Sequence, residues 1–345
     1  MYFRLIGILV ITSMKSLAMQ HDTASGASSS ASAPRDYTKI GMFCAYNQGN
    51  ENDTLFMEIG ENDSITSALQ KFGVNKRVIF YVTGYGDDMN PQFEKKMGSS
   101  FGYFQRFTYS FIRNQPDTIA CAFDYNLKDY RNACWFLGCF FNTVKSRIPF
   151  AARMIKKVAA EMFVNHVFTT FKNFELIGFS MGAHIAGLTA RFIKSEMEKD
   201  VLRIFALDPS MGIYKIENQL KKSDAKYIQA ILTSSLGQSD LDVHCKIFFN
   251  DGAIQPGCEE RLPGYRQHCS HIYAFLFYRN IIDKTSELIA YKLPEANEEV
   301  SNVPDHILVG HYANSNQDNA SGVFFANTVD SIGSIMNPKL KWTKK

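Results

Sequence analysis

The chain lacks a strong charge of either sign, and it lacks internal repeats. Its 345 residues carry 37 Lys and Arg against 34 Asp and Glu, which leaves a net charge of +3. A nucleic-acid partner usually requires a concentrated basic surface, so we expect none. No repeat and no second linker divide the sequence, which predicts a single domain over residues 37–345.

Long apolar runs are also missing, because no segment has the roughly 20 apolar residues that span a bilayer. The N-terminus instead combines Arg4, an apolar run over Leu5–Ile11, and the small residues of Ser16-Leu17-Ala18. This order is typical of a cleaved signal peptide, and Lys15 argues against a membrane anchor. We therefore predict a signal peptide over residues 1–18 and a secreted, extracellular protein. The Ser- and Ala-rich residues 19–36 predict a disordered arm.

The cysteine content agrees with an extracellular location. Seven cysteines in a secreted chain indicate disulfides, and the simplest arrangement is three pairs and one free thiol. Three Asn-x-Ser/Thr sequons, at Asn52, Asn62 and Asn319, are candidate glycosylation sites. Such sequons also arise by chance, so each remains a separate hypothesis.

Short apolar runs alternate with longer segments of helical spacing. The predicted strands are Val78–Val82, Thr118–Phe123, Phe174–Ile177, Arg203–Leu207 and Tyr227–Leu232. The predicted helices are Phe101–Arg113, Asn142–Val164, Ala183–Lys199 and Ile272–Ile282. Nearly continuous apolar strands between helices predict an α/β fold with a mostly parallel central sheet flanked by helices.

The segment Gly178-Phe-Ser180-Met-Gly182 contains the pattern Gly-x-Ser-x-Gly between a predicted strand and a predicted helix. A serine nucleophile in this setting stands on a very tight turn, where side chains two residues before and after would collide with neighbouring backbone. Glycine removes both side chains. Ser180 is therefore the candidate nucleophile. The alternative is an ordinary Gly-rich connection between a strand and a helix.

A serine hydroxyl needs a base, and the base needs an acid that orients it. In this type of fold the acid and then the histidine follow the serine along the chain. Asp208 ends a predicted strand and is the candidate acid, although an Asp-Pro pair can also simply cap a loop. His271 is the candidate base. Its rivals are His268 and His184, of which the latter is expected to pack beneath the serine turn.

Two backbone N–H groups are needed to hold the oxyanion that forms during acyl transfer. The first donor is expected at Met181, directly after the nucleophile. The second is expected in the loop after an early strand, where Tyr85 follows Thr83-Gly84.

Together these segments resemble the pancreatic lipase family of α/β-hydrolases. The similarity runs from about Met42 to Ile335 and is carried by Val82–Gly86, Ala122–Tyr125, Ile177–Gly187, Ala206–Ser210, Asp251–Cys258, Cys269–His271, Gly310–Asn314 and Val323–Asn327. The resemblance implies an α/β-hydrolase fold, the triad Ser180, Asp208 and His271, and oxyanion donors at Tyr85 and Met181. It implies no metal and no organic cofactor.

The sequence departs from the family pattern at two positions. Thr83 stands where the family usually has His, and Tyr125 stands where it usually has Trp. The first change lies beside the expected oxyanion site, so its geometry could differ. We also expect no C-terminal β-sandwich like that of the digestive lipases, and therefore no colipase-like partner.

In the family that this chain resembles, a lid segment lies between two cysteines that correspond to Cys258 and Cys269. We expect this pair to form a disulfide. Cys44–Cys121 and Cys134–Cys139 are further candidate pairs. Only ten residues separate Cys258 from Cys269, and a lid this short resembles those of the insect and venom phospholipases A1. A short lid leaves the cleft open and polar, which favours a phospholipid over a neutral lipid, although lid length can also vary without consequence.

The resulting hypothesis is a monomeric lipid carboxylic-ester hydrolase of the phospholipase A1 type that acts at a membrane or lipid surface. The alternatives are a triacylglycerol lipase, an esterase for small soluble esters, and a non-catalytic lipase-like binding or storage protein, similar to the yolk proteins of flies. Those yolk proteins lack the serine, whereas Ser180 is present here.

Overall fold

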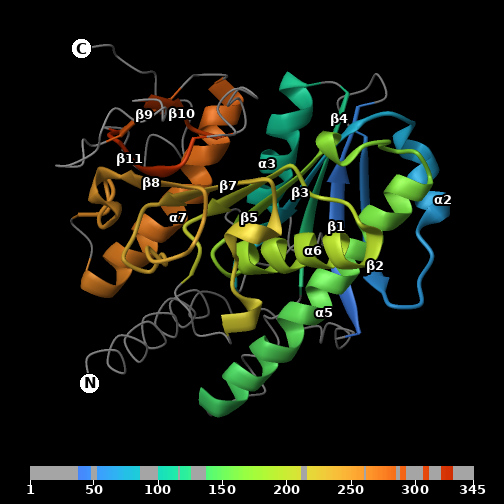
Figure 1. Ribbon diagram of the computed structural model, residues 1–345, viewed down its shortest axis with the longest axis horizontal. Helices are drawn as coiled ribbons and strands as arrows, with labels where there is room; N and C mark the ends of the chain where they lie inside the picture. Colours follow the sequence, from blue (N-terminus) through green and yellow to red (C-terminus); the bar gives the residue numbers. More distant parts are fainter. Residues whose placement is uncertain are drawn as a thin grey trace, which may run out of the picture.

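In the computed structural model of the chain, one large sheet forms the centre and helices cover both of its faces (Figure 1). The structure describes residues 38–47, 53–85, 100–115, 117–125, 137–210, 216–259, 262–284, 288–292, 306–310 and 320–328. The predicted signal peptide and N-terminal arm, together with Asn52, Cys134, His311 and Asn319, lie outside these ranges. In the described part of the chain, no helix is both long enough and apolar enough to cross a bilayer.

Among the residues that the structure describes, eleven strands form the sheet, in the order β10-β9-β11-β8-β7-β6-β5-β3-β4-β1-β2. The strands are β1 Lys39–Ala45, β2 Thr54–Gly60, β3 Arg77–Val82, β4 Thr118–Asp124, β5 Phe174–Phe179, β6 Arg203–Leu207, β7 Tyr227–Leu232, β8 Cys245–Phe249, β9 Ile289–Lys292, β10 His306–Leu308 and β11 Gly322–Ala326. Strands β4, β3, β5, β6, β7, β8 and β11 pair in parallel, and β1, β2, β9 and β10 add antiparallel pairs at the two ends.

The α-helices are α2 Thr66–Leu69, α3 Ser100–Asn114, α5 Leu137–Val164, α6 Met181–Met197 and α7 Pro263–Lys284. Short 3-10 turns are η1 Gln70–Phe72, η3 Phe171–Asn173, η4 Ile216–Asn218, η5 Lys222–Asp224 and η6 Asn250–Gly252. The five predicted strands and four predicted helices are confirmed with small shifts at their ends, except for α7. This helix begins at Pro263, so His271 lies inside the helix and not at its start.

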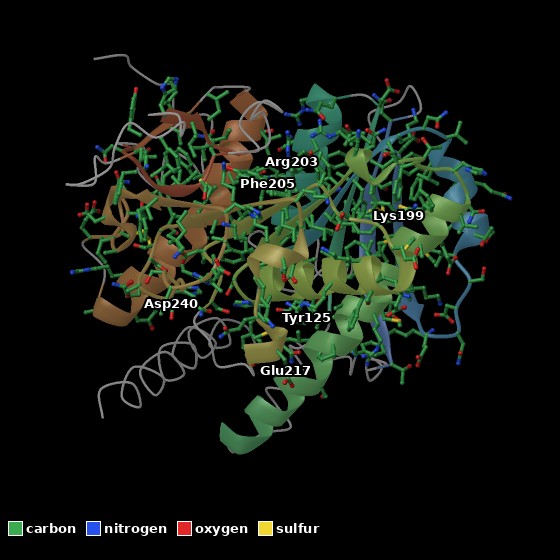
Figure 2. All side chains as sticks on the ribbon, viewed as in Figure 1. Tyr125, Lys199, Arg203, Phe205, Glu217 and Asp240 are labelled. Carbon is green, nitrogen blue, oxygen red and sulfur yellow. A yellow bond between two sulfur atoms is a disulfide. The ribbon has the colours of Figure 1, made fainter. Side chains whose placement is uncertain are left out.

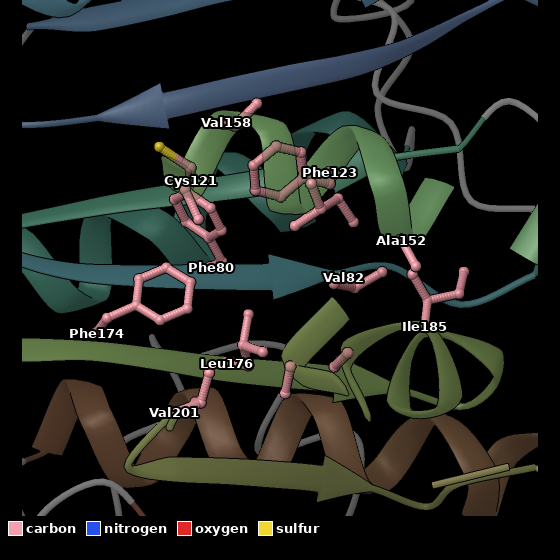
Figure 3. Close-up of a cluster of buried hydrophobic side chains, with 14 of the residues drawn as sticks. Phe80, Val82, Cys121, Phe123, Ala152, Val158, Phe174, Leu176, Ile185 and Val201 are labelled. Carbon is pink, nitrogen blue, oxygen red and sulfur yellow. The ribbon is translucent and has the colours of Figure 1, made fainter. Parts of the chain in front are cut away.

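Two hydrophobic cores lie on opposite faces of the sheet. Helices α5 and α6 pack on one face, where alternate strand residues such as Phe80 and Phe123 meet Ala152, Val158 and Ile185 (Figure 3). Helices α3 and α7 pack on the other face against the intervening strand residues. Because the central strands are buried on both faces, their sequences are mostly apolar, as the sequence pattern predicted.

Two disulfides join described residues. Cys258–Cys269 connects the segment after β8 to α7, and Cys44–Cys121 connects neighbouring positions of β1 and β4. These two pairs were predicted and are confirmed. The third predicted pair, Cys134–Cys139, lies partly outside the described residues. Cys245 is a buried free thiol. Of the three sequons, Asn62 is exposed in the turn after β2.

Candidate active site

Ser180 stands on a strained turn between β5 and α6. Its φ of 55° and ψ of −120° place a non-glycine residue in an unfavourable backbone region. The turn is held because the Ser180 N–H donates to the carbonyl of Leu207 on β6, at 2.9 Å, and the Ala183 N–H donates to the carbonyl of Ser180, at 3.2 Å. The side chain therefore projects at the carboxyl edge of the sheet, at the N-terminus of α6.

The glycines of the motif are required by close backbone contacts. A Cβ on Gly178 would lie 2.4 Å from the Cα of Ala183, inside the start of α6. A Cβ on Gly182 would lie 2.2 Å from the carbonyl oxygen of Val82, at the end of β3. Both distances are far below normal contact, so the strand, the turn and the helix can approach each other only with hydrogen at these two positions.

The same close approach brings together the two segments expected to supply the oxyanion donors. Gly182, in the first turn of α6, also faces the carbonyl oxygen of Thr83, which a Cβ would meet at 2.4 Å. The loop that carries Tyr85 therefore passes against the helix that begins at Met181. The positive end of the α6 dipole lies at the same place, where it favours a developing negative charge.

Thr83, which replaces the family's usual histidine, anchors this loop to β4. It is fully buried, and both its N–H and its Oγ1 donate to the carbonyl oxygen of Phe123, at 3.2 and 3.0 Å. The hydroxyl therefore has a structural partner on the neighbouring strand, which fixes the loop in place.

Asp208 follows β6 at the same edge of the sheet, and it is completely buried. Its N–H donates to the carbonyl of Ile231 on β7, at 2.7 Å. Four donors surround its carboxylate: His271 Nδ1 at 2.6 Å, Thr233 N at 2.8 Å, and Ser234 Oγ and N at 2.5 and 3.3 Å. An ionised carboxylate accepts about four hydrogen bonds and donates none, so this set of donors suits the anion.

Gly237 has no side chain, and the carboxylate of Asp208 occupies the space that a side chain there would fill. A Cβ on Gly237 would lie 2.4 Å from Asp208 Oδ1. The loop after β7 therefore encloses the carboxylate closely, and it supplies three of the four donors through Thr233 and Ser234. These two residues were not identified from the sequence, although their position after a buried parallel strand is where such sites gather.

His271 lies on α7, where its ring contacts Asp208 and the residue directly before Ser180. Its Nδ1 bonds Asp208, and its ring packs at 4.8 Å on the ring of Phe179, the residue directly before Ser180. In the described part of the chain, no hydrogen bond joins the Ser180 hydroxyl to His271. In free serine hydrolases the distance between the serine hydroxyl and the histidine is often long, and it shortens when substrate binds.

The rival histidines have other partners or positions. His184 is fully buried, its Nε2 bonds the carbonyl of Ser210 at 2.8 Å, and its Nδ1 accepts the Leu220 N–H at 3.2 Å. Burial lowers the pKa of His184 to about 4, so the ring is neutral at physiological pH. His268 lies one helical turn before His271 on α7. Of these three residues, His271 is the one bonded to the buried carboxylate.

A model of the lipase family, described as "Lipase", matches residues 21–298 of the sequence. The chain belongs to the lipase family. Its parallel sheet with a serine on the turn between β5 and α6 is an α/β-hydrolase fold, as predicted. In the described part of this lipase-family chain, no group of three or more His, Cys, Asp or Glu side chains is arranged to hold a metal ion.

Several relatives of this lipase-family chain are named phospholipase A1. That of Solenopsis invicta is 28% identical over 154 residues, which cover 44% of this chain and 43% of the relative. That of Vespula vulgaris is 26% identical over 203 residues, covering 56% and 59%. Lipase member H of Danio rerio is 25% identical over 228 residues, covering 64% and 45%. The match thus spans about half the length of these relatives.

Proposed function

We propose that this chain is a secreted hydrolase of lipid carboxylic esters in which Ser180, His271 and Asp208 form the catalytic triad. The observation that carries the proposal is the bond between His271 Nδ1 and Asp208 Oδ2, at 2.6 Å, beside the strained turn that presents Ser180. A histidine oriented by a buried carboxylate, close to a serine on a strained turn, is the arrangement that acyl transfer by a serine nucleophile requires.

The proposed reaction begins when Ser180 Oγ attacks the acyl carbonyl carbon and His271 Nε2 takes the hydroxyl proton. Asp208 holds the other ring nitrogen and stabilises the imidazolium. The N–H groups of Tyr85 and Met181 bind the oxyanion, each worth about 3 kcal/mol in comparable sites. When the intermediate collapses, His271 returns its proton to the departing alcohol. Water, activated by the same histidine, then releases the fatty acid from Ser180.

Within this reaction class we propose a phospholipase A1-type preference. The support is the short segment of ten residues between Cys258 and Cys269, together with relatives that are named phospholipase A1. The last part of that segment, from Pro263 onward, already belongs to α7, so little chain is left to cover the cleft. A charged head group is therefore accommodated more easily than under a long apolar lid.

The experiment compares the purified protein with Ser180→Ala on phosphatidylcholine, galactolipid and triolein, side by side. We expect the wild type to hydrolyse phosphatidylcholine fastest, and the variant to lose activity by about 10⁴-fold or more. The control is Ser195→Ala, which changes an exposed serine on the same helix α6 and should leave hydrolysis unchanged.

Three results would change the proposal. Undiminished hydrolysis by Ser180→Ala would falsify the assignment of the nucleophile. A wild-type protein that binds lipid without hydrolysing any ester supports the storage-type alternative. Faster hydrolysis of triolein keeps the triad but replaces the phospholipid preference with that of a triacylglycerol lipase.

A further inference from the structure

Gln255 is a fully buried glutamine in the segment between β8 and α7, and both the nitrogen and the oxygen of its amide are hydrogen-bonded. Nε2 donates to the carbonyls of Thr233 at 2.9 Å and Phe249 at 2.7 Å. Oε1 accepts the side-chain N–H of Asn250 at 2.9 Å. The side chain therefore ties together the ends of β7 and β8, at the edge of the sheet where Ser180 and Asp208 lie.

The backbone of Gln255 reaches the helix that carries His271. Its N–H donates to Ser270 Oγ at 3.0 Å, and its carbonyl accepts the N–H of Cys258 at 3.0 Å. Ser270 is completely buried and directly precedes His271 on α7. One residue thus contacts the loop that binds the acid through its side chain and the helix of the base through its main chain.

These contacts close a ring around the acid and the base. Asp208 Oδ1 accepts the N–H of Thr233, the Thr233 carbonyl accepts from Gln255, and the Gln255 N–H donates to Ser270. The chain then passes to His271, whose Nδ1 returns to Asp208 Oδ2. We propose that Gln255 is a positioning residue that fixes the distance and orientation between Asp208 and His271, an inference that rests on the proposed function of this pair.

The acid and the base need such a connection because they lie on different elements. Asp208 follows β6, whereas His271 lies on α7, 63 positions later in the sequence, and two strands lie between them. The disulfide Cys258–Cys269 attaches the Gln255 segment to α7, and the Gln255 amide forms the buried hydrogen bond from this segment to the loop after β7. In a buried site these hydrogen bonds meet no competition from water, so they restrict the geometry strongly.

A second glutamine offers a matched control. Gln267, on α7, also bonds the loop after β7, where its Oε1 accepts from the N–H and Oγ of Ser235 at 3.2 and 2.7 Å. These bonds are exposed, whereas those of Gln255 are buried. Water can replace the partners of Gln267 when its amide is removed, but it cannot do so readily for Gln255.

The test compares Gln255→Met with Gln267→Met, since methionine keeps the length of the side chain and removes the amide. We expect Gln255→Met to lower kcat for phosphatidylcholine by about 10- to 100-fold with little change in KM, because a small misplacement of the base has an effect of this size. We expect Gln267→Met to change kcat by less than about threefold. Equal kcat values for Gln255→Met and wild type would overturn the proposal, as would equal losses in both variants.

The proton between His271 Nδ1 and Asp208 gives a readout that does not depend on turnover. We expect its downfield NMR resonance to weaken or vanish in Gln255→Met and to persist in Gln267→Met. A resonance unchanged in Gln255→Met contradicts the positioning role, even if the variant is less stable. If the wild type proves inactive but the resonance still depends on Gln255, the positioning role stands and the proposed hydrolase function fails.

If Gln255→Met does not fold, Ser270→Ala opens the same ring at another bond with a smaller change. It removes the Oγ that accepts from Gln255 and leaves the Cys258–Cys269 disulfide in place. We expect the same loss of kcat and of the proton resonance in the folded variant. A Ser270→Ala protein that keeps both at the wild-type level also rejects the proposal.

Discussion

Two buried histidines near the serine turn differ in what their ring nitrogens contact. His271 bonds the carboxylate of Asp208, which stabilises the imidazolium when the ring takes a proton. His184 bonds two backbone groups, the carbonyl of Ser210 and the N–H of Leu220. The neutral ring, with hydrogen on Nε2, satisfies both groups. His184 therefore joins α6 to the segments after β6 and serves the structure, while His271 is equipped to exchange a proton.

His184 makes stability depend on pH in a defined window. Burial lowers its pKa from 6.5 to about 4, so the unfolded chain binds a proton between these values and the folded chain does not. The contribution to stability is complete above pH 6.5 and is lost as pH falls towards 4, by about 3 kcal/mol in total. Urea unfolding of the wild type and His184→Gln at several pH values measures this, and the variant should show the shallower decline. Parallel declines in the two proteins would contradict it.

At the scale of elements, the turn from β5 to α6 places the serine because three backbones meet there. The hydrogen at Gly182 allows α6 to begin against the end of β3, and the hydrogen at Gly178 allows β5 to turn directly into that helix. The strain at Ser180 persists because hydrogen bonds to β6 and within α6 fix the residue on both sides.

Gly182→Ala should therefore disturb the site as well as the fold. The added Cβ would lie 2.2 Å from the carbonyl oxygen of Val82, so β3 and α6 must separate. We expect a loss of about 1–3 kcal/mol in unfolding free energy. We also expect lower kcat in the molecules that remain folded, because the two proposed oxyanion donors move apart.

Gly41→Ala on β1 is the matched control. Its Cβ would meet its nearest neighbour, Asp124 Cβ, at an ordinary 3.6 Å. We expect stability within about 1 kcal/mol of the wild type and an unchanged kcat. Equal behaviour of the two glycine variants in chemical denaturation and turnover would show that the close approach at Gly182 has no special importance.

Across the whole molecule, the two edges of the parallel sheet carry different chemistry. The carboxyl edge holds Ser180 and Asp208, while the opposite edge holds a buried ionic cluster. There Glu175 Oε1 lies 2.6 Å from Arg77 and 3.6 Å from Arg203, on the neighbouring strands β3 and β6. Arg203 lies close to the core residue Phe205 on the same strand (Figure 2). This cluster holds three strands in register at the edge away from the site.

Glu175→Gln should lower stability and leave the chemistry intact. The substitution keeps the size of the side chain but leaves two guanidinium groups facing a neutral amide, at a cost of about 3 kcal/mol. The control Glu196→Gln removes an exposed partner of Lys156 and should cost less than about 1 kcal/mol. Thermal unfolding measures both costs. A kcat per folded molecule that falls in Glu175→Gln would show that this edge also contributes to the site.

The sequence predicted the parallel strands because each is buried on both faces and therefore reads as an apolar run. The strands β1, β2, β8, β9 and β10 were not predicted. Most of β2 alternates between exposed and half-buried residues, and β8 alternates between buried and half-buried residues, so neither is a continuous apolar run. The start of α7 was also missed, although Pro263 occupies the first position of the helix, where proline is favoured.

The residues of the candidate site likewise divide into those that the sequence predicted and those that it did not. Ser180, Asp208 and His271 follow from a local motif, a strand end and the order of residues along the chain. The partners that hold Asp208 have no such pattern. Thr233, Ser234 and Gln255 reach their places through the register of β7 and β8 and through the packing of α7, which only the folded chain shows.

Labelling with a fluorophosphonate ester tests the central claim most directly, because the reagent is attacked by a serine that is activated in the folded protein. The account predicts one adduct per native chain, located on the peptide that contains Ser180, and none on Ser180→Ala or on heat-denatured wild type. A native protein that stays unlabelled, or that carries the adduct on another residue, would contradict the proposed triad.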